Sequence, residues 1–260
     1  MARKTIGIAL SGGGARGFAH IGVLKALEDH SISIDFISGT SAGSFVGAAM
    51  ASGMTVAELT AVAKKIGWLN MTSLSYSPRA ILSNAPMGKF IRQHFPVQRF
   101  EDLSLPLSLV ACDLETGEEV ILKDHGDIAF AVRASCAVPG VFLPLTDENG
   151  RHLVDGGVTS PMPAKHVRRM GADIVIAVDL MACGAAFRGL PKTLAGAFFQ
   201  SAMMMLRTAS KNQHYRADVV IEPQIAHLRP DEIRKMDEFI ELGERAALEQ
   251  IDKIKELAEA

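Results

Sequence analysis

Three short glycine-containing motifs in this sequence hold the residue types that nucleophilic chemistry needs. The first covers residues 11–17 and reads Ser-Gly-Gly-Gly-Ala-Arg-Gly. Glycine adopts backbone angles that other residues avoid, so such a loop turns its N–H groups toward an anion. That anion would be a dinucleotide pyrophosphate or the oxyanion of an acyl-transfer intermediate. A tight turn without a ligand is the alternative, and a P-loop is excluded because no Lys-Ser or Lys-Thr pair follows the glycines.

The second motif is Gly-Thr-Ser-Ala-Gly at residues 39–43, between a β-branched run and a helical pattern. A G-x-S-x-G sequence in that context is typical of a nucleophile elbow, a sharp turn that exposes the serine hydroxyl. Gly39 and Gly43 would let the strand and the helix pack closely, and the helix N-terminus favours developing negative charge. Ser41 is therefore the candidate nucleophile, and the alternative is a plain helix N-cap.

The third motif is Asp155-Gly156-Gly157, which follows a short apolar run. An acidic residue held at a strand end can accept the proton of a nearby serine, although Asp-Gly is also common in ordinary turns. The combination of motifs is more specific, because a serine nucleophile needs both a base and an oxyanion hole. All three motifs follow predicted strands, and open α/β sheets form their sites at the carboxyl ends of strands.

In these motifs the sequence resembles the patatin-like phospholipase family. The resemblance runs from about residue 6 to residue 167 and includes Arg-Ala-Ser-Cys-Ala-Val-Pro-Gly at 133–140, which precedes the acid in bacterial members. It implies a catalytic dyad of Ser41 as nucleophile and Asp155 as base. It also implies an oxyanion hole formed by the N–H groups of Gly13, Gly14 and Ala15. The other motif residues would support these groups: Gly12, Arg16, Gly17, Gly39, Gly43, Gly156 and Gly157.

The resemblance implies a serine acyl-ester hydrolase that acts on phospholipids, lysophospholipids or other fatty-acyl esters, without a metal or a cofactor. Two alternatives stay open. A regulatory or adaptor protein would keep the fold while its partner interaction is its main role. A dinucleotide-binding protein would use Gly12, Gly14 and Gly17, but Asp35, the acid nearest the ribose position, comes early in its predicted strand.

Histidine could complete a Ser-acid-His triad, because three histidines follow Asp155 in the sequence. His166, His214 and His227 lack the loop setting of a catalytic histidine, so we expect them to be surface or packing residues. We expect His20 to pack near the glycine loop without a role in proton transfer. The dyad therefore remains the preferred arrangement.

Positioning these motifs requires strands that alternate with helices. The sequence shows this order, which predicts a three-layer α/β/α fold with a mostly parallel central sheet, as in patatin-like proteins. Strands are predicted at 5–10, 34–38, 105–112, 119–123, 173–180 and 217–222, and helices at 17–30, 42–52, 55–66, 87–94, 128–135, 163–170 and 193–214, with a last helix from Pro230. A hairpin around 148–150 would lead into Asp155. Residues 1–170 would form the catalytic domain, and 171–260 a C-terminal extension packed on the same domain.

Composition and charge limit the partners. The chain has 260 residues, of which 48% are hydrophobic and 22% charged, as in an average folded domain. Its 27 basic and 29 acidic residues give a net charge of -2 without a basic stripe, which argues against nucleic-acid binding. The cysteines at 112, 136 and 183 fit a reducing compartment and offer no zinc spacing. With no signal peptide or transmembrane run, we expect a cytoplasmic protein; nothing in the sequence indicates its oligomeric state.

One apolar stretch bears on contact with lipids. Phe198-Phe199 and Met203-Met204-Met205 follow a glycine-containing segment, 183–192, which we expect to be a mobile loop. A buried core helix is the favoured interpretation of this stretch. A lipid-facing or acyl-chain surface is the alternative, because methionine adapts to varied ligands. The expected substrate is thus a lipid or fatty-acyl ester held by residues from 67–100 and 183–205, with peripheral membrane contact as a secondary expectation.

Overall fold

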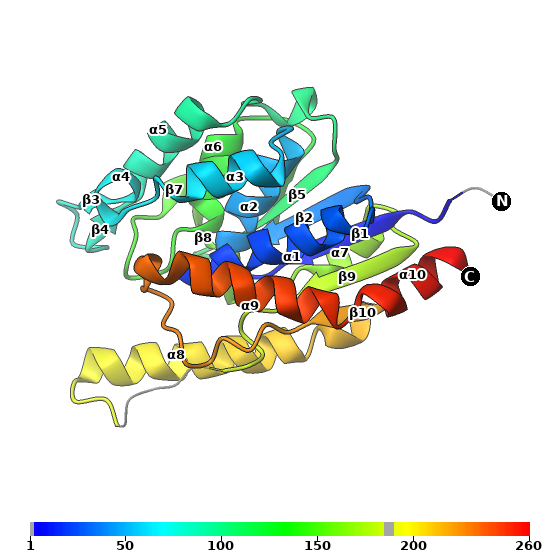
Figure 1. Ribbon diagram of the computed structural model, residues 1–260. Helices are drawn as coiled ribbons and strands as arrows, with labels where there is room; N and C mark the ends of the chain where they lie inside the picture. The colour runs from blue at the N-terminus through cyan, green and yellow to red at the C-terminus, as the bar shows by residue number, and fades with distance from the viewer. Residues whose placement is uncertain (1–2, 185–189) are drawn as a thin grey trace.

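The computed structural model describes residues 3–184 and 190–260. Its centre is an eight-stranded sheet in the order β10-β9-β1-β2-β5-β8-β7, with β6 paired to β5. The parallel strands are β10 (Val219–Ile221), β9 (Ile174–Val178), β1 (Ile6–Leu10), β2 (Phe36–Thr40) and β5 (Leu107–Asp113). Antiparallel to their neighbours are β6 (Glu119–Lys123), β7 (Leu145–Thr146) and β8 (His152–Asp155). The predicted mostly parallel sheet between helices is confirmed (Figure 1).

Different helices bury the two faces of this sheet. One face is covered by α1 (Phe18–Asp29), α2 (Ala42–Ala51) and α9 (Met236–Leu248), and the other by α7 (Ala164–Arg169). Alternate residues of β1 serve the two faces: Ile8 and Leu10 pack in the large core with α1 and α9, whereas Ala9 packs with Val167 of α7. Burial on both faces explains why β1 is a continuous apolar run in the sequence.

The remaining elements surround this sheet. They are α3 (Val56–Ala63), α4 (Trp68–Met71), the two-stranded sheet of β3 (Ser73–Leu74) and β4 (Leu82–Ser83), α5 (Ala85–His94), α6 (Ile128–Ser135), α8 (Leu194–Lys211) and α10 (Ile251–Glu259). Short 3-10 helices lie at Gly14–Gly17, Phe100–Asp102, Gly156–Val158, His214–Arg216 and Ile233–Lys235. None of the helices in the described part of the chain is long and apolar enough to cross a lipid bilayer.

Strand β5 holds two other strands end to end along one of its edges. It pairs first with β2 in parallel, with Val110 opposite Thr40, and then with β8 in antiparallel, with Ala111 opposite Asp155. Its other edge is occupied by β6 at both positions. Strands β2 and β8 therefore run toward each other on the same edge of β5. Their carboxyl ends meet, which brings the residue after Thr40 next to Asp155.

Residues after 170 complete the sheet. Strand β9 pairs with β1 along its whole length, and β10 pairs with β9. Helix α9 crosses α1 closely, since a Cβ atom on Gly243 would lie only 2.0 Å from the carbonyl oxygen of Ala19. The division at residue 170 remains a prediction. In the structure it falls between α7 and β9, both of which pack on β1.

The predicted last helix is wrong in two respects. It does not begin at Pro230, because the Pro230 carbonyl accepts a hydrogen bond from Ala15 and ties this segment to the glycine loop. It also breaks at Glu249 and Gln250, between α9 and α10, where neither glycine nor proline marks the break in the sequence. The predicted hairpin before Asp155 is confirmed by the pairing of β7 with β8. Of the predicted loop at 183–192, residues 185–189 lie outside the described residues.

Candidate active site

Ser41 occupies the sharp turn between β2 and α2. Its φ of 53° and ψ of -122° belong to a region that residues other than glycine rarely adopt. Such a conformation costs on the order of 1–3 kcal/mol and is typical of functional sites. Gly43 permits the turn, because a Cβ atom there would lie 2.1 Å from the carbonyl oxygen of Leu10. The Ser41 N–H donates to the hydroxyl of Ser135 at 2.9 Å, which fixes the turn against α6.

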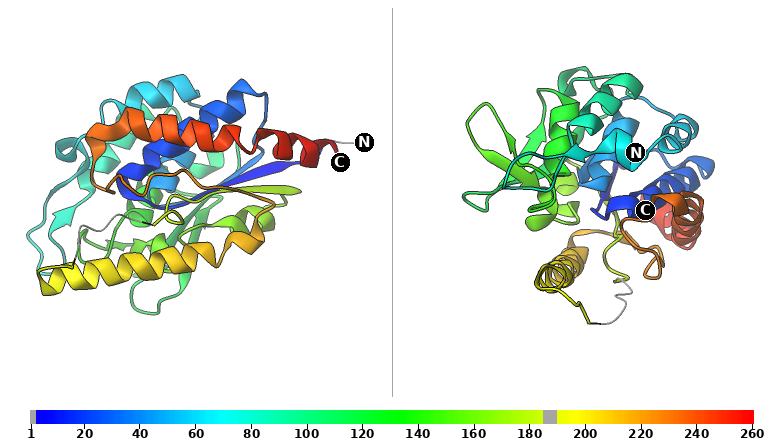
Figure 2. Two further views of the ribbon diagram at one scale, coloured as in Figure 1. Left: turned by 60° about the horizontal axis from the view of Figure 1, so that its bottom comes forward. Right: turned by 90° about the vertical axis from the view of Figure 1, so that its left-hand side faces the viewer.

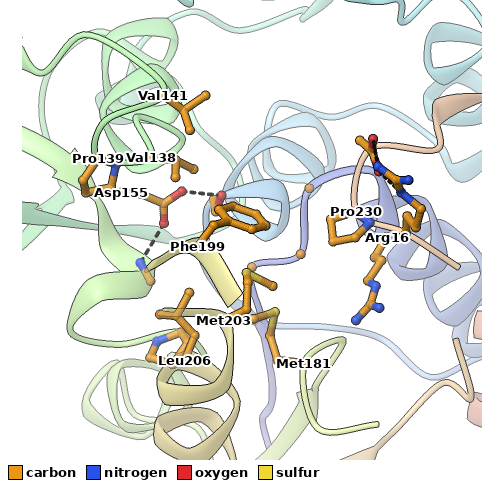
Figure 3. Close-up of a pocket in the computed structure, with 18 of the residues that line it drawn as sticks. Arg16, Val138, Pro139, Val141, Asp155, Met181, Phe199, Met203, Leu206 and Pro230 are labelled. Atoms are coloured by element: carbon orange, nitrogen blue, oxygen red, sulfur yellow. Dashed lines mark hydrogen bonds and ion pairs between the residues drawn. The ribbon is translucent and has the colours of Figure 1, made fainter. Parts of the chain in front are cut away.

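Asp155, the last residue of β8, reaches the hydroxyl of Ser41. Its Oδ2 accepts a hydrogen bond from Ser41 Oγ at 2.6 Å, and its Oδ1 accepts one from the Gly157 N–H at 2.7 Å (Figure 3). The carboxylate is only 5% exposed. Burial raises the pKa of Asp155 to about 6, although both hydrogen bonds act in the opposite direction. At neutral pH this carboxylate is therefore ionised in most molecules and in position to accept the serine proton.

The glycine loop after β1 lines the same cavity as Ser41. The Ala15 N–H donates to the carbonyl of Pro230 at 2.7 Å, so it does not face a ligand. Among the described residues, the N–H groups of Gly13 and Gly14 have no hydrogen-bond partner. The structure thus leaves two of the three expected oxyanion donors available and removes Ala15.

Arg16 connects the glycine loop to two distant segments. Its side chain is 1% exposed and donates hydrogen bonds to the carbonyls of Leu180, Gly184 and Leu228 at 2.8–3.2 Å. Carbonyl oxygens, rather than a carboxylate, are the partners of this buried guanidinium. Arg16 therefore holds the loop in place and adds a positive charge beside it.

The other motif glycines allow close contact between backbones. A Cβ atom on Gly17 would lie 2.7 Å from that of Ala42, and one on Gly156 would lie 2.2 Å from the carbonyl oxygen of Val110. A Cβ atom on Gly39 would lie 2.5 Å from the carbonyl oxygen of Gly43. The glycine loop, the turn at Ser41 and the turn after Asp155 are thus packed against the strands that carry them.

A sequence model of the patatin-like phospholipase family matches residues 8–168, which include the glycine loop, Ser41 and Asp155. The chain belongs to the patatin-like phospholipase family. Residues 8–168 include most of β1 and all of β2 and β8, the three strands whose carboxyl ends lead into the three motifs.

Individual members of the family support this assignment. The chain is 38% identical over 186 residues to patatin-like phospholipase domain-containing protein 6 from Mus musculus, which covers 68% of this chain and 14% of that protein. It is 35% identical over 183 residues to lysophospholipase NTE1 from Yarrowia lipolytica, which covers 68% and 13%. The chain thus spans about one seventh of the length of these curated relatives.

Two solved structures share the fold. VipD from Legionella pneumophila superposes with a TM-score of 0.57 at 15% identity, over 97% of this chain and 67% of that chain. ExoU from Pseudomonas aeruginosa, crystallised with SpcU, superposes with a TM-score of 0.55 at 17% identity, over 99% and 53%. At these identities the likeness concerns the fold alone.

In this patatin-like chain, Ser41 lies where two cavities meet. The larger has a volume of about 560 Å³ and lies between Asp155 on one side and Pro230 on the other (Figure 3). Its walls are largely apolar and include Phe199, Met203 and Leu206 of α8, together with Val138, Pro139 and Val141. Near these walls it also has polar lining residues: Gln200, Arg229 and Asp231.

The smaller cavity has a volume of about 190 Å³ and extends from Ser41 toward the core. It is lined by side chains of α2, α3, α4 and α5, among them Phe45, Leu59, Met71 and Met87, and by Ile66 between α3 and α4. The two cavities share Trp68 as well as Ser41. Ser41 therefore borders two largely apolar compartments.

Helix α8 is not the buried core helix that the sequence favoured. Phe198 is 69% exposed and Met205 is 67% exposed, while Phe199 and Met203 line the larger cavity. The helix is anchored at its C-terminal end, where the buried Ser210 donates to the carboxylate of Asp179. The rest of α8 forms a wall of the cavity, and its outer apolar side chains face away from the protein.

No histidine among the described residues lines either cavity. His166 lies beside Glu119, His214 contacts Asp179 at 2.7 Å, and His227 contacts Glu238. His20 is buried against the carbonyl of Ser11, and burial lowers its pKa to about 4. A Ser-acid-His triad is thus excluded in this part of the chain.

The dinucleotide alternative finds no support. Asp35 accepts hydrogen bonds from the Ile6 N–H and from Arg3, so it lies at the amino end of β1, away from the glycine loop. Pro230 in addition covers the loop, because a Cβ atom on Gly14 would lie 2.6 Å from its carbonyl oxygen.

Sequence reasoning missed two residues of this site, Ser135 and Pro230. Ser135 fixes the turn at Ser41, and it lies within the segment 133–140 that already carried part of the resemblance. The Pro230 carbonyl accepts the Ala15 N–H. Pro230 has no local signal, because it lies far along the chain from residues 11–17. Trp68, which lines both cavities, falls within 67–100, one of the two segments expected to hold the substrate.

Proposed function

We propose that this chain is a lipid acyl hydrolase that cleaves the ester bonds of phospholipids, lysophospholipids or other fatty-acyl esters, with Ser41 and Asp155 as its catalytic dyad. The observation that carries the proposal is the 2.6 Å hydrogen bond from a strained serine to a buried carboxylate, at the junction of two apolar cavities. Family membership supports the class of reaction, and relatives are named phospholipase and lysophospholipase.

The dyad supports a two-step mechanism. Asp155 accepts the proton of Ser41 Oγ as that oxygen forms a bond to the acyl carbon, and the carbonyl oxygen becomes an oxyanion that the N–H groups of Gly13 and Gly14 stabilise. The intermediate expels the alcohol, which takes the proton from Asp155, and leaves an ester on Ser41. Water then attacks this ester while Asp155 again accepts a proton. The fatty acid departs, and the proton returns to Ser41.

The two cavities suggest where the acyl chain and the alcohol part of a substrate bind. The smaller one has no charged lining residue and fits the part of an acyl chain nearest the ester. Its 190 Å³ corresponds to about six water volumes, and a methylene group is of similar size. The larger cavity, with Gln200, Arg229 and Asp231 in its lining, fits the alcohol side of the ester. The expected contact with a membrane surface belongs to this proposal, and the exposed side chains of α8 support it.

A fluorophosphonate probe tests the proposed nucleophile. We expect the probe to label Ser41, as identified by peptide mass spectrometry. The labelling rate should rise with pH up to about pH 6 and then level off, because only ionised Asp155 accepts the serine proton. Below that pKa, the rate should fall about tenfold per pH unit. A folded protein that stays unlabelled at pH 8 would support the adaptor alternative.

Filling the smaller cavity tests whether the acyl chain binds there. Ile66 lines only that cavity, so Ile66→Trp should lower kcat/KM for p-nitrophenyl decanoate by at least about tenfold. Hydrolysis of p-nitrophenyl acetate should change little, because an acetyl group does not reach the filled space. Leu206→Trp, in the larger cavity, is the matched control and should leave the dependence on acyl-chain length unchanged. The same dependence on acyl-chain length in both variants would contradict the assignment of the acyl chain to the smaller cavity.

A further inference from the structure

Exposed apolar side chains are concentrated in two segments that we call the apolar rim, residues 68–81 and 190–205. These segments hold eleven of the fifteen large apolar side chains exposed in the described part of the chain. The eleven are Trp68, Leu69, Leu74, Tyr76, Ile81, Leu190, Leu194, Phe198, Phe199, Met204 and Met205. Patches of this kind mark interaction surfaces.

The rim borders the mouth of the larger cavity. Trp68 from one segment and Phe199 from the other both line that cavity. In Figure 1, α4, β3, β4 and the N-terminal end of α8 all lie on the left-hand side of the molecule. This side faces the viewer in the right-hand view of Figure 2. A surface that covers the rim would therefore also face the opening that leads to Ser41.

The rim lies in stretches of chain that contain no acidic residue. Residues 59–100 and 180–217 are the two longest stretches without Asp or Glu, and together they contain 11 Lys and Arg residues. Their net charge of +11 compares with -2 for the whole chain, which leaves -13 on the remainder. A nearly neutral protein thus concentrates positive charge in the segments that expose its apolar side chains.

Several of these cations are free to meet an external anion. Arg92 and Arg99 are paired with Asp127 and Glu101. By contrast, Lys64, Lys65, Arg79 and Lys192 are exposed and have no ion pair with any acidic side chain in residues 3–184 and 190–260. In sequence they lie beside or among the exposed apolar residues, as Arg79 does between Tyr76 and Ile81.

We propose that the apolar rim docks the protein on an anionic lipid surface, with the mouth of the larger cavity toward the lipid. Apolar side chains would enter the boundary between head groups and acyl chains, and Lys and Arg would neutralise anionic head groups. The charge argues against a second copy of this chain as the occupant, because two rims facing each other would bring like charges together. The choice of lipid rests on the proposed function, whereas docking itself requires no hydrolysis.

Vesicle sedimentation tests the charged part of the surface. The protein is used with Ser41→Ala, so that the lipid is not consumed, and vesicles contain phosphatidylcholine with or without phosphatidylglycerol. We expect much stronger binding when phosphatidylglycerol is present. The triple variant Lys65→Gln, Arg79→Gln, Lys192→Gln should weaken that binding by about a hundredfold. The matched control is Lys253→Gln with Lys255→Gln on α10, two exposed cations outside the rim, which should bind as strongly as the parent.

The apolar part is tested by Leu74→Ser, Tyr76→Ser and Phe198→Ser together, none of which lines either cavity. This variant should lose binding to anionic vesicles, whereas Leu248→Ser, an exposed residue of α9, should not. With Ser41 restored, the rim variant should hydrolyse p-nitrophenyl acetate at the parent rate. That result would show that the fold and the catalytic site are intact.

Three outcomes would overturn the docking proposal. One is equal binding to vesicles with and without phosphatidylglycerol. Another is an equal loss of binding in the control variants on α9 and α10. The third is lipid-free self-association that the rim variants abolish, which would assign the rim to contact between two copies. If the protein with Ser41 intact binds vesicles but hydrolyses no ester, that result would instead contradict the proposed function and still support docking.

Discussion

Replacing Ser41 with alanine is expected to lower kcat/KM for a p-nitrophenyl ester by roughly four to six orders of magnitude, the size of loss seen when a serine hydrolase loses its nucleophile. The proposed mechanism has a single nucleophile, and no other serine hydroxyl of the described residues lines the cavities. Alanine keeps the Cβ atom and the strained backbone of the turn, so the circular dichroism spectrum should stay the same. The measurement is steady-state hydrolysis together with that spectrum.

A serine at the far end of the same helix provides the control. Ser52 is buried, and its hydroxyl donates to the carbonyl of Ala49, away from both cavities. Ser52→Ala should retain the parent activity within a few fold. Full activity in Ser41→Ala, or an equal loss in Ser52→Ala, would remove Ser41 from the mechanism.

Replacing Asp155 with asparagine should lower activity by about 10⁴-fold, because an amide does not accept the serine proton. The same change should stabilise the protein at pH 8. The asparagine Oδ1 still accepts the Gly157 N–H, and its amide group still reaches Ser41 Oγ. What disappears is the cost of a buried, ionised carboxylate. Catalytic residues often lower stability in this way.

The sign of this stability effect follows from the raised pKa. Asp155 has a pKa of about 6 in the folded protein against the ordinary aspartate value of 3.8, so the folded state binds its proton more tightly. The protonated carboxyl group therefore stabilises the folded state. This stabilisation is fully present below pH 3.8 and is lost as pH rises through about 6. Above that pH the ionised carboxylate costs up to about 3 kcal/mol in the free energy of unfolding. The gain in the free energy of unfolding from Asp155→Asn should therefore grow from pH 4 to pH 8.

Urea unfolding at several pH values measures this difference. Asp173 supplies a control of opposite sign, because hydrogen bonds from the Thr5 N–H and hydroxyl lower the pKa of Asp173. Asp173→Asn should thus destabilise the protein most at pH 8. In acid, as the carboxyl group of Asp173 becomes protonated, the stability of the variant should approach that of the parent. A loss of stability in Asp155→Asn that is the same at pH 4 and pH 8 would contradict the assigned pKa.

The sequence predicted those parts of the site that are built from neighbouring residues. The glycine loop after β1 and the turn after β2 each join a strand to the helix that follows it, so residue order, glycine placement and apolar pattern sufficed. The hairpin that leads to Asp155 was predicted on the same basis. The partnership of Ser41 with Asp155 came from the family resemblance, since nothing local in the sequence relates two residues so far apart.

Other features depend on distant contacts and had no local signal. Pro230 removes the Ala15 amide from the expected oxyanion hole, although both segments look ordinary in sequence. Helix α8 was misjudged for a different reason. Apolar residues at helical spacing look the same whether they face a protein core, a cavity or the outside, and in α8 they face the last two.

The end-to-end arrangement of β2 and β8 on β5 has a consequence for how the protein acquires activity. The nucleophile is carried by strands that pair early in the chain, while the base arrives on a hairpin more than a hundred residues later. Contacts this distant in sequence close a large loop, which makes them slow to form. A partly folded chain could thus hold the serine turn without its base. The proposed dyad would be complete, and ester hydrolysis expected, only after β8 had paired with β5.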